Sequence, residues 1–233
     1  MDILYISPHY DDAIISCGGK IYSDVKEGHN VSVVTIFSEV KGPFSDYAKS
    51  LHSYWKLTDP FLERRNENIN ACKILGVENI TLGLEDAIYR TFNSKFLYPN
   101  NGDIFRKINL HDKNIKNKIV DKIKKIATKD STIYFPLGIG NHVDHVLAFR
   151  SGLQLRKEGY RIGFYMDFSY SGSIPTECND MNQKKVKLTK EALDAKCNAV
   201  KKYASQLCML FANPKNIKTY YVSKLKGEEV YYE

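Results

Sequence analysis

ILYISPHYDD, at residues 3–12, is the stretch that decides the fold. Its first five residues form a short apolar run typical of a strand buried in a parallel sheet, and Pro8 ends that run. Apolar residues then recur at helical spacing over residues 13–26, with Gly28 as the expected stop. VSVVTIF at residues 31–37 is rich in β-branched residues and is the clearest strand of the chain. The sequence therefore opens with a βαβ unit.

The rest of the chain continues this alternation. Further strands are expected at residues 79–84, 132–135 and 161–166, and helices at residues 61–75, 114–128, 142–157 and 190–210. Loops are expected at residues 38–60, 86–112 and 172–187, and one or two edge strands at residues 220–233. The first two loops are long enough to shape substrate choice. The pattern predicts a single α/β domain over residues 1–233, a Rossmann-like sandwich with a mainly parallel sheet flanked by helices.

Composition narrows the class of protein. The chain has 233 residues, of which 43% are hydrophobic and 26% charged, as in ordinary globular domains. Its five cysteines are scattered, odd in number and without a CxxC pair, so free thiols are expected rather than a disulfide framework or a cysteine zinc site. Neither a signal peptide nor a run of about 18 apolar residues is visible. We therefore expect a cytoplasmic protein with no membrane partner.

The formal net charge is +7, and many lysines fall within residues 113–129 and 184–202. Two interpretations are open: a surface for nucleic acid or an anionic substrate, or the solvated faces of two helices. Because neither stretch has the interleaved aromatic residues of a single-strand binder, we favour solvated faces and expect no nucleic-acid partner. The charge mildly favours an anionic substrate such as a nucleotide sugar. The sequence leaves the oligomeric state open, including a homo-oligomer.

Two polar clusters directly follow predicted strands: PHYDD at residues 8–12 and HVDH at residues 142–145. Since ligands bind outside the carboxyl ends of parallel strands, the two clusters are expected to face one site. Catalytic zinc takes imidazole and carboxylate ligands and keeps one position open. His9, Asp12 and His145 would supply such a set without cysteine.

The remaining residues of the two clusters fit amide hydrolysis assisted by a metal ion. Asp11 would act as general base on the water. His142 would stabilise the oxyanion or protonate the leaving amine, and Asp144 would bond a ring nitrogen of His142 or His145. The alternative is purely structural: Asp11 and Asp12 would be a helix N-cap and a first-turn carboxylate, and HVDH a helix start with surface histidines.

Together the motifs resemble the LmbE-like or PIG-L-like family, which carries P-H-x-D-D after its first strand and H-x-D-H after a later one. Further segments are also similar to segments of the family. They are Cys17-Gly18-Gly19, the helix with RRNE at residues 64–67 and LGV at residues 75–77, LGLED at residues 82–86 and YASQ at residues 203–206. The resemblance extends over nearly the whole chain.

The resemblance implies a Rossmann-like deacetylase that uses a divalent metal, usually zinc, with Fe²⁺ or another divalent ion as alternatives. It implies removal of an N-acetyl group from an amino sugar or related glycoside, including a nucleotide-linked sugar or a natural-product intermediate, by attack of a zinc-bound water. By position, the metal ligands of the family match His9, Asp12 and His145. Its general base matches Asp11, and its further site residues match His142 and Asp144. Arg64 and Asp86 fall where the family grips substrate hydroxyls or phosphate.

This chain also departs from the family pattern. Gly140 stands where some members present a tyrosine to the oxyanion, and the replacement donor could come from Tyr10, Tyr134 or Tyr170. An amidase for another N-acyl group on the same scaffold is an alternative function. A non-catalytic, nucleotide-binding Rossmann domain is a further one, although the G-x-G-x-x-G fingerprint is missing after the first strand.

Overall fold

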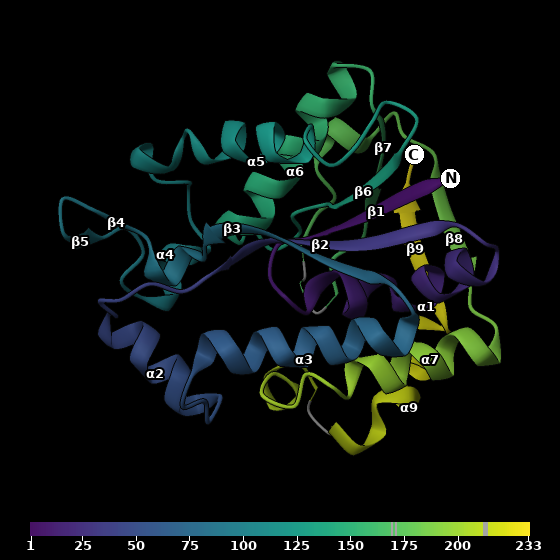
Figure 1. Ribbon diagram of the computed structural model, residues 1–233, viewed down its shortest axis with the longest axis horizontal. Helices are drawn as coiled ribbons and strands as arrows, with labels where there is room; N and C mark the ends of the chain where they lie inside the picture. Colours follow the sequence, from purple (N-terminus) through teal and green to yellow (C-terminus); the bar gives the residue numbers. More distant parts are fainter. Residues whose placement is uncertain (169, 171, 212–213) are drawn as a thin grey trace.

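A computed structural model describes residues 1–168, 170, 172–211 and 214–233 of the chain (Figure 1). The strands are β1 (Asp2–Ser7), β2 (Asn30–Glu39), β3 (Glu78–Glu85), β4 (Thr91–Phe92), β5 (Lys95–Phe96), β6 (Thr132–Pro136), β7 (Arg161–Tyr165), β8 (Gln183–Lys187) and β9 (Glu228–Tyr232). The α-helices are α1 (Asp12–Lys26), α2 (Asp46–Tyr54), α3 (Pro60–Leu75), α4 (Asn101–Ile104), α5 (Ile115–Ile123), α6 (Val143–Lys157), α7 (Lys190–Val200), α8 (Leu207–Leu210) and α9 (Ile217–Leu225).

Seven strands form one sheet in the order β3-β2-β1-β6-β7-β9-β8. The first five are mutually parallel, and β9 runs antiparallel to both of its neighbours, β7 and β8. The mainly parallel α/β fold predicted from the sequence is therefore confirmed. Chain order reverses between β1 and β6, because β1 leads outward to β2 and β3 on one side and β6 begins the other half. This reversal is the switch point at which open α/β sheets bind ligands.

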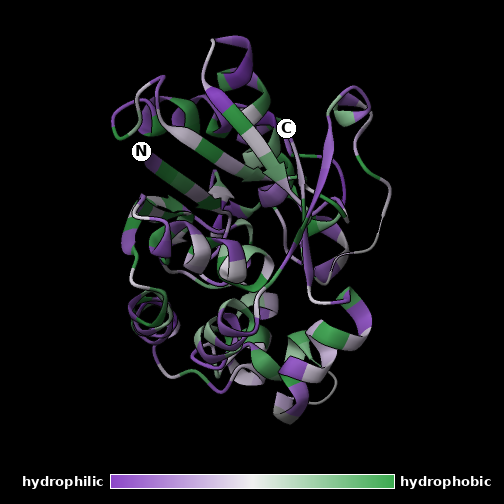
Figure 2. Cartoon of the chain, turned by 90° about the vertical axis from the view of Figure 1, so that its right-hand side faces the viewer, coloured by the Kyte–Doolittle hydropathy of each residue, from purple (hydrophilic) through white to green (hydrophobic). Residues whose placement is uncertain are grey.

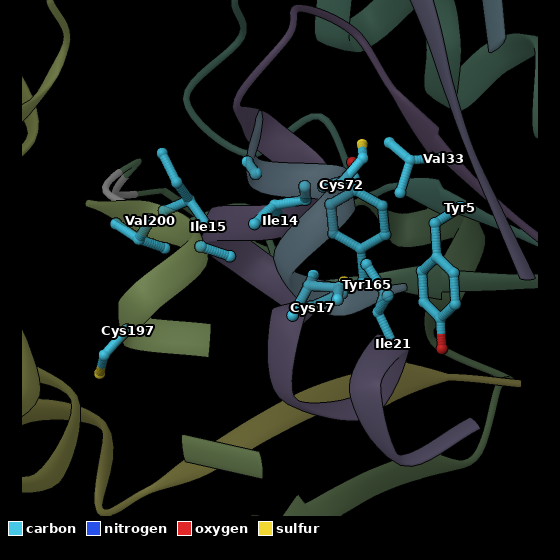
Figure 3. Close-up of a cluster of buried hydrophobic side chains, with 14 of the residues drawn as sticks. Tyr5, Ile14, Ile15, Cys17, Ile21, Val33, Cys72, Tyr165, Cys197 and Val200 are labelled. Carbon is cyan, nitrogen blue, oxygen red and sulfur yellow. The ribbon is translucent and has the colours of Figure 1, made fainter. Parts of the chain in front are cut away.

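Helices cover both sides of the sheet (Figure 1), and the central strands β1, β2, β6 and β7 are accordingly buried along most of their length. Along β1, Tyr5 packs with α1, α3 and α7 on one face, whereas Leu4 and Ile6 pack with α5 and α6 on the other. Figure 3 shows the first of these cores, where Tyr5 and Val33 from the strands lie near Ile14 and Ile21 of α1. Hydrophilic and hydrophobic residues alternate along the helices that cover the sheet (Figure 2).

Several sequence-based boundaries were wrong. The predicted loop at residues 38–60 contains α2, which begins after Ser45, whose side chain accepts a hydrogen bond from the Ala48 backbone amide at 3.0 Å. The predicted loop at residues 172–187 ends in strand β8, and the helix predicted over residues 114–128 is the shorter α5. Short polar segments of this kind form helices or strands through tertiary contacts, which the local sequence pattern does not reveal.

The last third of the chain also differs from prediction. Instead of one helix over residues 190–210, α7 ends at Val200, and Ser205 then bonds Glu67 of α3 through both its backbone amide and its hydroxyl, at 2.8 and 2.7 Å. Residues 220–233 do not form edge strands alone: α9 occupies the first part, and β9 lies inside the sheet between β7 and β8.

Two side-chain predictions were also tested by the structure. All five cysteines are free, as expected. The lysines of residues 184–202 are mostly solvated, but Lys196 is buried, so that prediction was wrong for this residue. Within the part of the chain that the structure describes, no helix is both long and apolar enough to cross a membrane.

Candidate metal and catalytic site

The two polar clusters meet at the carboxyl ends of β1 and β6, which are neighbours in the sheet. A pocket opens there, with about 810 Å³ of empty space including its mouth, and His9, Asp11, Asp12 and His142 line it. The structure thus brings together residues that are more than 130 positions apart, as predicted from the strand ends.

His9, Asp12 and His145 converge closely enough to hold one metal ion, since one ligand atom of each lies within 4.8 Å of the others. Asp12 Oδ2 lies 3.1 Å from His9 Nδ1 and 3.3 Å from His145 Nε2. The same oxygen accepts the His9 backbone amide at 2.7 Å, which fixes the carboxylate. Burial would raise the pKa of Asp12, but the two histidines hold it well below its usual range. Asp12 is therefore an anion.

His145 is oriented for metal binding by a residue that the sequence did not suggest. Its Nδ1 lies 2.5 Å from Asp167 Oδ1, so Nδ1 carries a proton and Nε2 is the ring nitrogen that faces Asp12. Nε2 is buried and lies 3.3 Å from the Asp12 carboxylate, with which it would share a metal ion. A carboxylate behind a metal-binding imidazole is the usual second partner of such ligands. Burial would lower the pKa of His145, but Asp12 and Asp167 raise it to about 9.

His9 is held by Asp144, which corrects the predicted role of that aspartate. Asp144 was expected to bond a ring nitrogen of His142 or His145, but its Oδ2 lies 3.1 Å from His9 Nε2. The carboxylate also accepts the Ala87 amide at 3.0 Å and lies 2.7 Å from the Arg90 guanidinium. Burial opposes ionisation, but Arg90 and His9 hold the pKa of Asp144 well below its usual range. Because Nε2 of His9 faces the Asp144 carboxylate, the other ring nitrogen, Nδ1, faces Asp12.

A second triplet, His9, His142 and Asp144, also satisfies the distance criterion for a metal ion. Its carboxylate is already neutralised by Arg90, and His142 Nδ1 accepts the Asp144 backbone amide at 3.3 Å. The Asp12 carboxylate of the first triplet has no such arginine partner among the described residues and faces the two histidines instead. The first triplet fits a divalent ion better.

His142 is the N-cap of α6, so the structural interpretation of HVDH as a helix start is correct in part. However, His142 and His145 are both buried rather than on the surface. Because Nδ1 of His142 accepts a backbone amide, its neutral ring carries the proton on Nε2. Burial, and then the charge of His9, lower the pKa of His142 well below its usual range. His142 is a neutral donor that lines the pocket.

Asp11 occupies the N-cap position of α1, yet its side chain caps no backbone amide of the helix. The helix therefore lacks a side-chain capping hydrogen bond, which typically stabilises a helix by about 1 kcal/mol. Instead Oδ1 lies 3.3 Å from Arg64 Nη2 at the pocket wall. Burial and the Asp12 carboxylate raise the pKa of Asp11, with Arg64 opposing them. A buried carboxylate with a raised pKa has the properties of a general base.

Arg64 and Asp86, which were expected to bind substrate, both line the pocket, and each also has a partner within the protein. The Arg64 guanidinium carbon lies 5.1 Å from the centre of the Trp55 ring, in addition to its contact with Asp11. Asp86 Oδ1 accepts the Ile88 amide at 3.2 Å, and its Oδ2 lies 3.6 Å from His9 Nε2. Asp86 is therefore a turn-capping residue and a pocket residue at once.

Of the three tyrosines left open as oxyanion donors, the structure places Tyr170 in the pocket. Tyr10 donates to the Ser38 carbonyl and Tyr134 to the Glu233 carboxylate, so both hydroxyls are used elsewhere. The Tyr170 ring centre lies 4.8 Å from that of His145. A Cβ on residue 140 would come within 2.8 Å of the Tyr170 ring, and Gly140 also has a positive φ of 84°. Gly140 thus makes room for Tyr170.

Asp167 and Arg90 were the site residues that sequence reasoning missed. Asp167 lies two residues beyond β7, at the same sheet edge as the two motifs, so its position was a usable signal. Arg90 follows a short 3-10 helix, Ala87–Tyr89, in a region without regular pattern, and gave no such signal. Its side chain lies 2.9 Å from Asp112 as well as 2.7 Å from Asp144.

Fold and site together define a Rossmann-like α/β protein with a cluster of two histidines and one aspartate at the switch point of its sheet. The chain belongs to the PIG-L family, described as GlcNAc-PI de-N-acetylase, whose family model matches residues 4–155. The resemblance to LmbE-like and PIG-L-like deacetylases is thereby confirmed.

Individual relatives are named as deacetylases. The chain is 30% identical over 191 residues to 2'-N-acetylparomamine deacetylase of Niallia circulans, a match that covers 72% of this chain and 66% of that protein. It is 25% identical to the zinc-inhibited form of a teicoplanin deacetylase, with a TM-score of 0.83 over 100% of this chain and 97% of the other. It is 27% identical to the A40926 pseudoaglycone deacetylase, with a TM-score of 0.76 and coverages of 99% and 95%.

Proposed function

We propose that this protein is a metal-dependent deacetylase that hydrolyses the N-acetyl group of an amino sugar or related glycoside. The observation that carries the proposal is the cluster of His9, Asp12 and His145, in which one ligand atom of each residue lies within 4.8 Å of the others and the Asp12 carboxylate faces both rings. Membership of a family described by de-N-acetylation and the names of its relatives support the same reaction. The substrates named for these relatives are 2'-N-acetylparomamine, the A40926 pseudoaglycone and teicoplanin.

The donor set suits zinc, which accepts two imidazoles and a carboxylate, and it also suits Fe²⁺. A bound divalent ion polarises the amide carbonyl and makes water a better proton donor near neutral pH. His9, Asp12 and His145 would hold it, and Asp144 and Asp167 would orient the two rings.

Side chains of the protein then transfer protons and donate hydrogen bonds during the reaction. Asp11 takes a proton from the attacking water. The Nε2 proton of His142 hydrogen-bonds the carbonyl oxygen as negative charge develops on it, and the Tyr170 hydroxyl is a second candidate donor. Burial, and then Asp12 and Asp11, raise the pKa of Tyr170, so its hydroxyl stays protonated. When the C–N bond breaks, the proton held by Asp11 passes to the amine, and acetate and a free amine are released.

The test begins with metal analysis of the purified protein beside His9→Ala. About one zinc or iron per chain, lost in the variant, is expected. N-acetylglucosamine glycosides and 2'-N-acetylparomamine are then assayed for acetate release after loading with one equivalent of zinc or of Fe²⁺. The equivalent is kept to one because a structural relative is described as zinc-inhibited. Absence of metal after such loading would overturn the proposal.

A further inference from the structure

The pocket changes character from its base to its mouth. At the base the residues are polar and buried, with exposures of 8% for His9, 5% for Asp11 and 6% for His142. Outside them lies an apolar wall, built by α2, α4 and α8 and their last turns. We define the apolar wall by its residues Leu51, Trp55, Ile104, Phe105, Met209 and Leu210.

Large side chains of the apolar wall face solvent. Phe105 is 39% and Met209 49% exposed, although both border a pocket that leads to the catalytic cluster. Exposed apolar side chains that are grouped around one pocket mark a surface that becomes buried by a ligand. Burial of apolar area on them is favourable roughly in proportion to the area covered.

Part of the apolar wall is packed against the interior of the protein. Trp55 and Ile104 belong to a separate buried cluster with Ala48, Tyr89 and Tyr98, away from the two cores of the sheet. Phe105 packs edge-on against His142, with ring centres 5.4 Å apart. The apolar wall therefore begins in direct contact with the proposed oxyanion donor.

The charges of the pocket are confined to its base. Among the described residues that line it, the charged side chains other than histidine are Asp11, Asp12, Arg64 and Asp86. Arg64 is the single cation of that set and lies 3.3 Å from Asp11. A nucleotide sugar would bring a pyrophosphate that needs cations beyond this pair. The net charge of +7 is thus not concentrated at the pocket.

We propose that the substrate carries an uncharged alkyl or aryl group, joined to the N-acylated sugar, and that this group packs against the apolar wall. The inference rests on the proposed function, because it takes the catalytic cluster as the place of the amide. It goes further in assigning the chemistry of the group beyond the sugar. That group is joined either to the glycosidic oxygen or, as a longer chain, to the acyl carbon.

The experiment compares matched substrates of the zinc-loaded enzyme. The pairs are methyl and hexyl N-acetyl-β-glucosaminide for the glycosidic side, and N-acetyl- and N-hexanoylglucosamine for the acyl side. At least one longer member should have a kcat/KM about tenfold or more above that of its partner, because several methylene groups become buried. The pair that shows the preference identifies the side. UDP-N-acetylglucosamine should be poorer than the methyl glycoside.

The double variant Phe105→Ala, Met209→Ala should reduce that preference to below about threefold. The matched control is Phe92→Ala, Val222→Ala, which removes two similarly exposed apolar side chains outside the pocket and should keep the wild-type ratio. Ratios near one for both pairs, or UDP-N-acetylglucosamine as the best substrate, would overturn the inference while leaving the proposed function intact.

If none of these amides is hydrolysed, the proposed function fails. The inference about the apolar wall is then tested separately, by measuring ligand binding. Calorimetry on the Asp11→Asn protein then compares hexyl with methyl N-acetyl-β-glucosaminide. Tighter binding of the hexyl compound, about tenfold, that is lost in the Phe105→Ala, Met209→Ala background supports the apolar wall as a binding surface. Equal binding of the two compounds contradicts it.

Discussion

Asp11 and Asp12 are adjacent, yet their carboxylates have different partners. Asp12 is the first residue of α1 and contacts His9 and His145, whereas Asp11 sits before the helix and contacts Arg64. The divergence follows from geometry, because consecutive side chains at a helix start point in different directions. One carboxylate can thus bind a cation while the other remains free to move a proton.

Asp11→Asn should lower kcat by about 10²- to 10⁴-fold, the usual contribution of a general base, while metal content stays unchanged. Steady-state kinetics and elemental analysis on the same preparation check this. The control Asp130→Asn changes an exposed aspartate and should behave as wild type. Full turnover by Asp11→Asn would remove Asp11 from the role of base.

Asp167→Asn tests the orientation of His145. Without the carboxylate at 2.5 Å, the ring loses the partner that keeps its Nδ1 protonated, and metal affinity should fall about 10- to 100-fold. Competition with a chromophoric chelator measures the affinity, with the exposed Asp180→Asn as control. Equal affinity of Asp167→Asn and wild type would show that His145 does not need this carboxylate.

At the scale of elements, a buried ion pair joins β9 to α1 and α7. Lys196 Nζ lies 2.7 Å from Glu229 Oε1, and both side chains are at most 2% exposed. Glu229 also accepts the backbone amides of Gly19 and Lys20, so it anchors the helix that follows the PHYDD motif. This pair therefore fixes β9 against the two helices.

Lys196→Met should lower the free energy of unfolding by about 3–5 kcal/mol, because it leaves the Glu229 carboxylate buried without its cation. Denaturant unfolding measures the loss. Lys202→Met, an exposed change just beyond α7, should stay within about 0.5 kcal/mol of wild type. The double variant Lys196→Met, Glu229→Gln should recover part of the stability, and strictly additive losses would argue against a coupled pair.

At the scale of the whole molecule, binding of the proposed metal should stabilise the folded protein. Its ligands come from two halves of the sheet and meet only in the folded state. Free zinc at about 1,000 times its Kd should add roughly 4 kcal/mol to the free energy of unfolding. For a chain of this size the melting temperature should rise by roughly 8–16 °C. Thermal unfolding with zinc or with a chelator checks this. A comparable rise in His145→Ala would place the ion elsewhere.

The sequence alone determined the parallel core and the two motifs. Strands buried on both faces are continuously apolar, and ligands collect at their carboxyl ends, so ILYIS, VSVVTIF and the clusters around His9 and His145 could be interpreted locally. Most of the candidate site could be named for this reason. The family resemblance added the expected role of each residue.

Only the tertiary structure decided which partner each group has. Asp144 bonds His9 rather than a histidine of its own motif, Asp167 orients His145, and Arg90 neutralises Asp144. The same holds for the elements α2, α4 and α8 that form the apolar wall, and for β9 inside the sheet. These choices depend on contacts between residues far apart in the chain, and periodicity and motif spacing describe only neighbours along it.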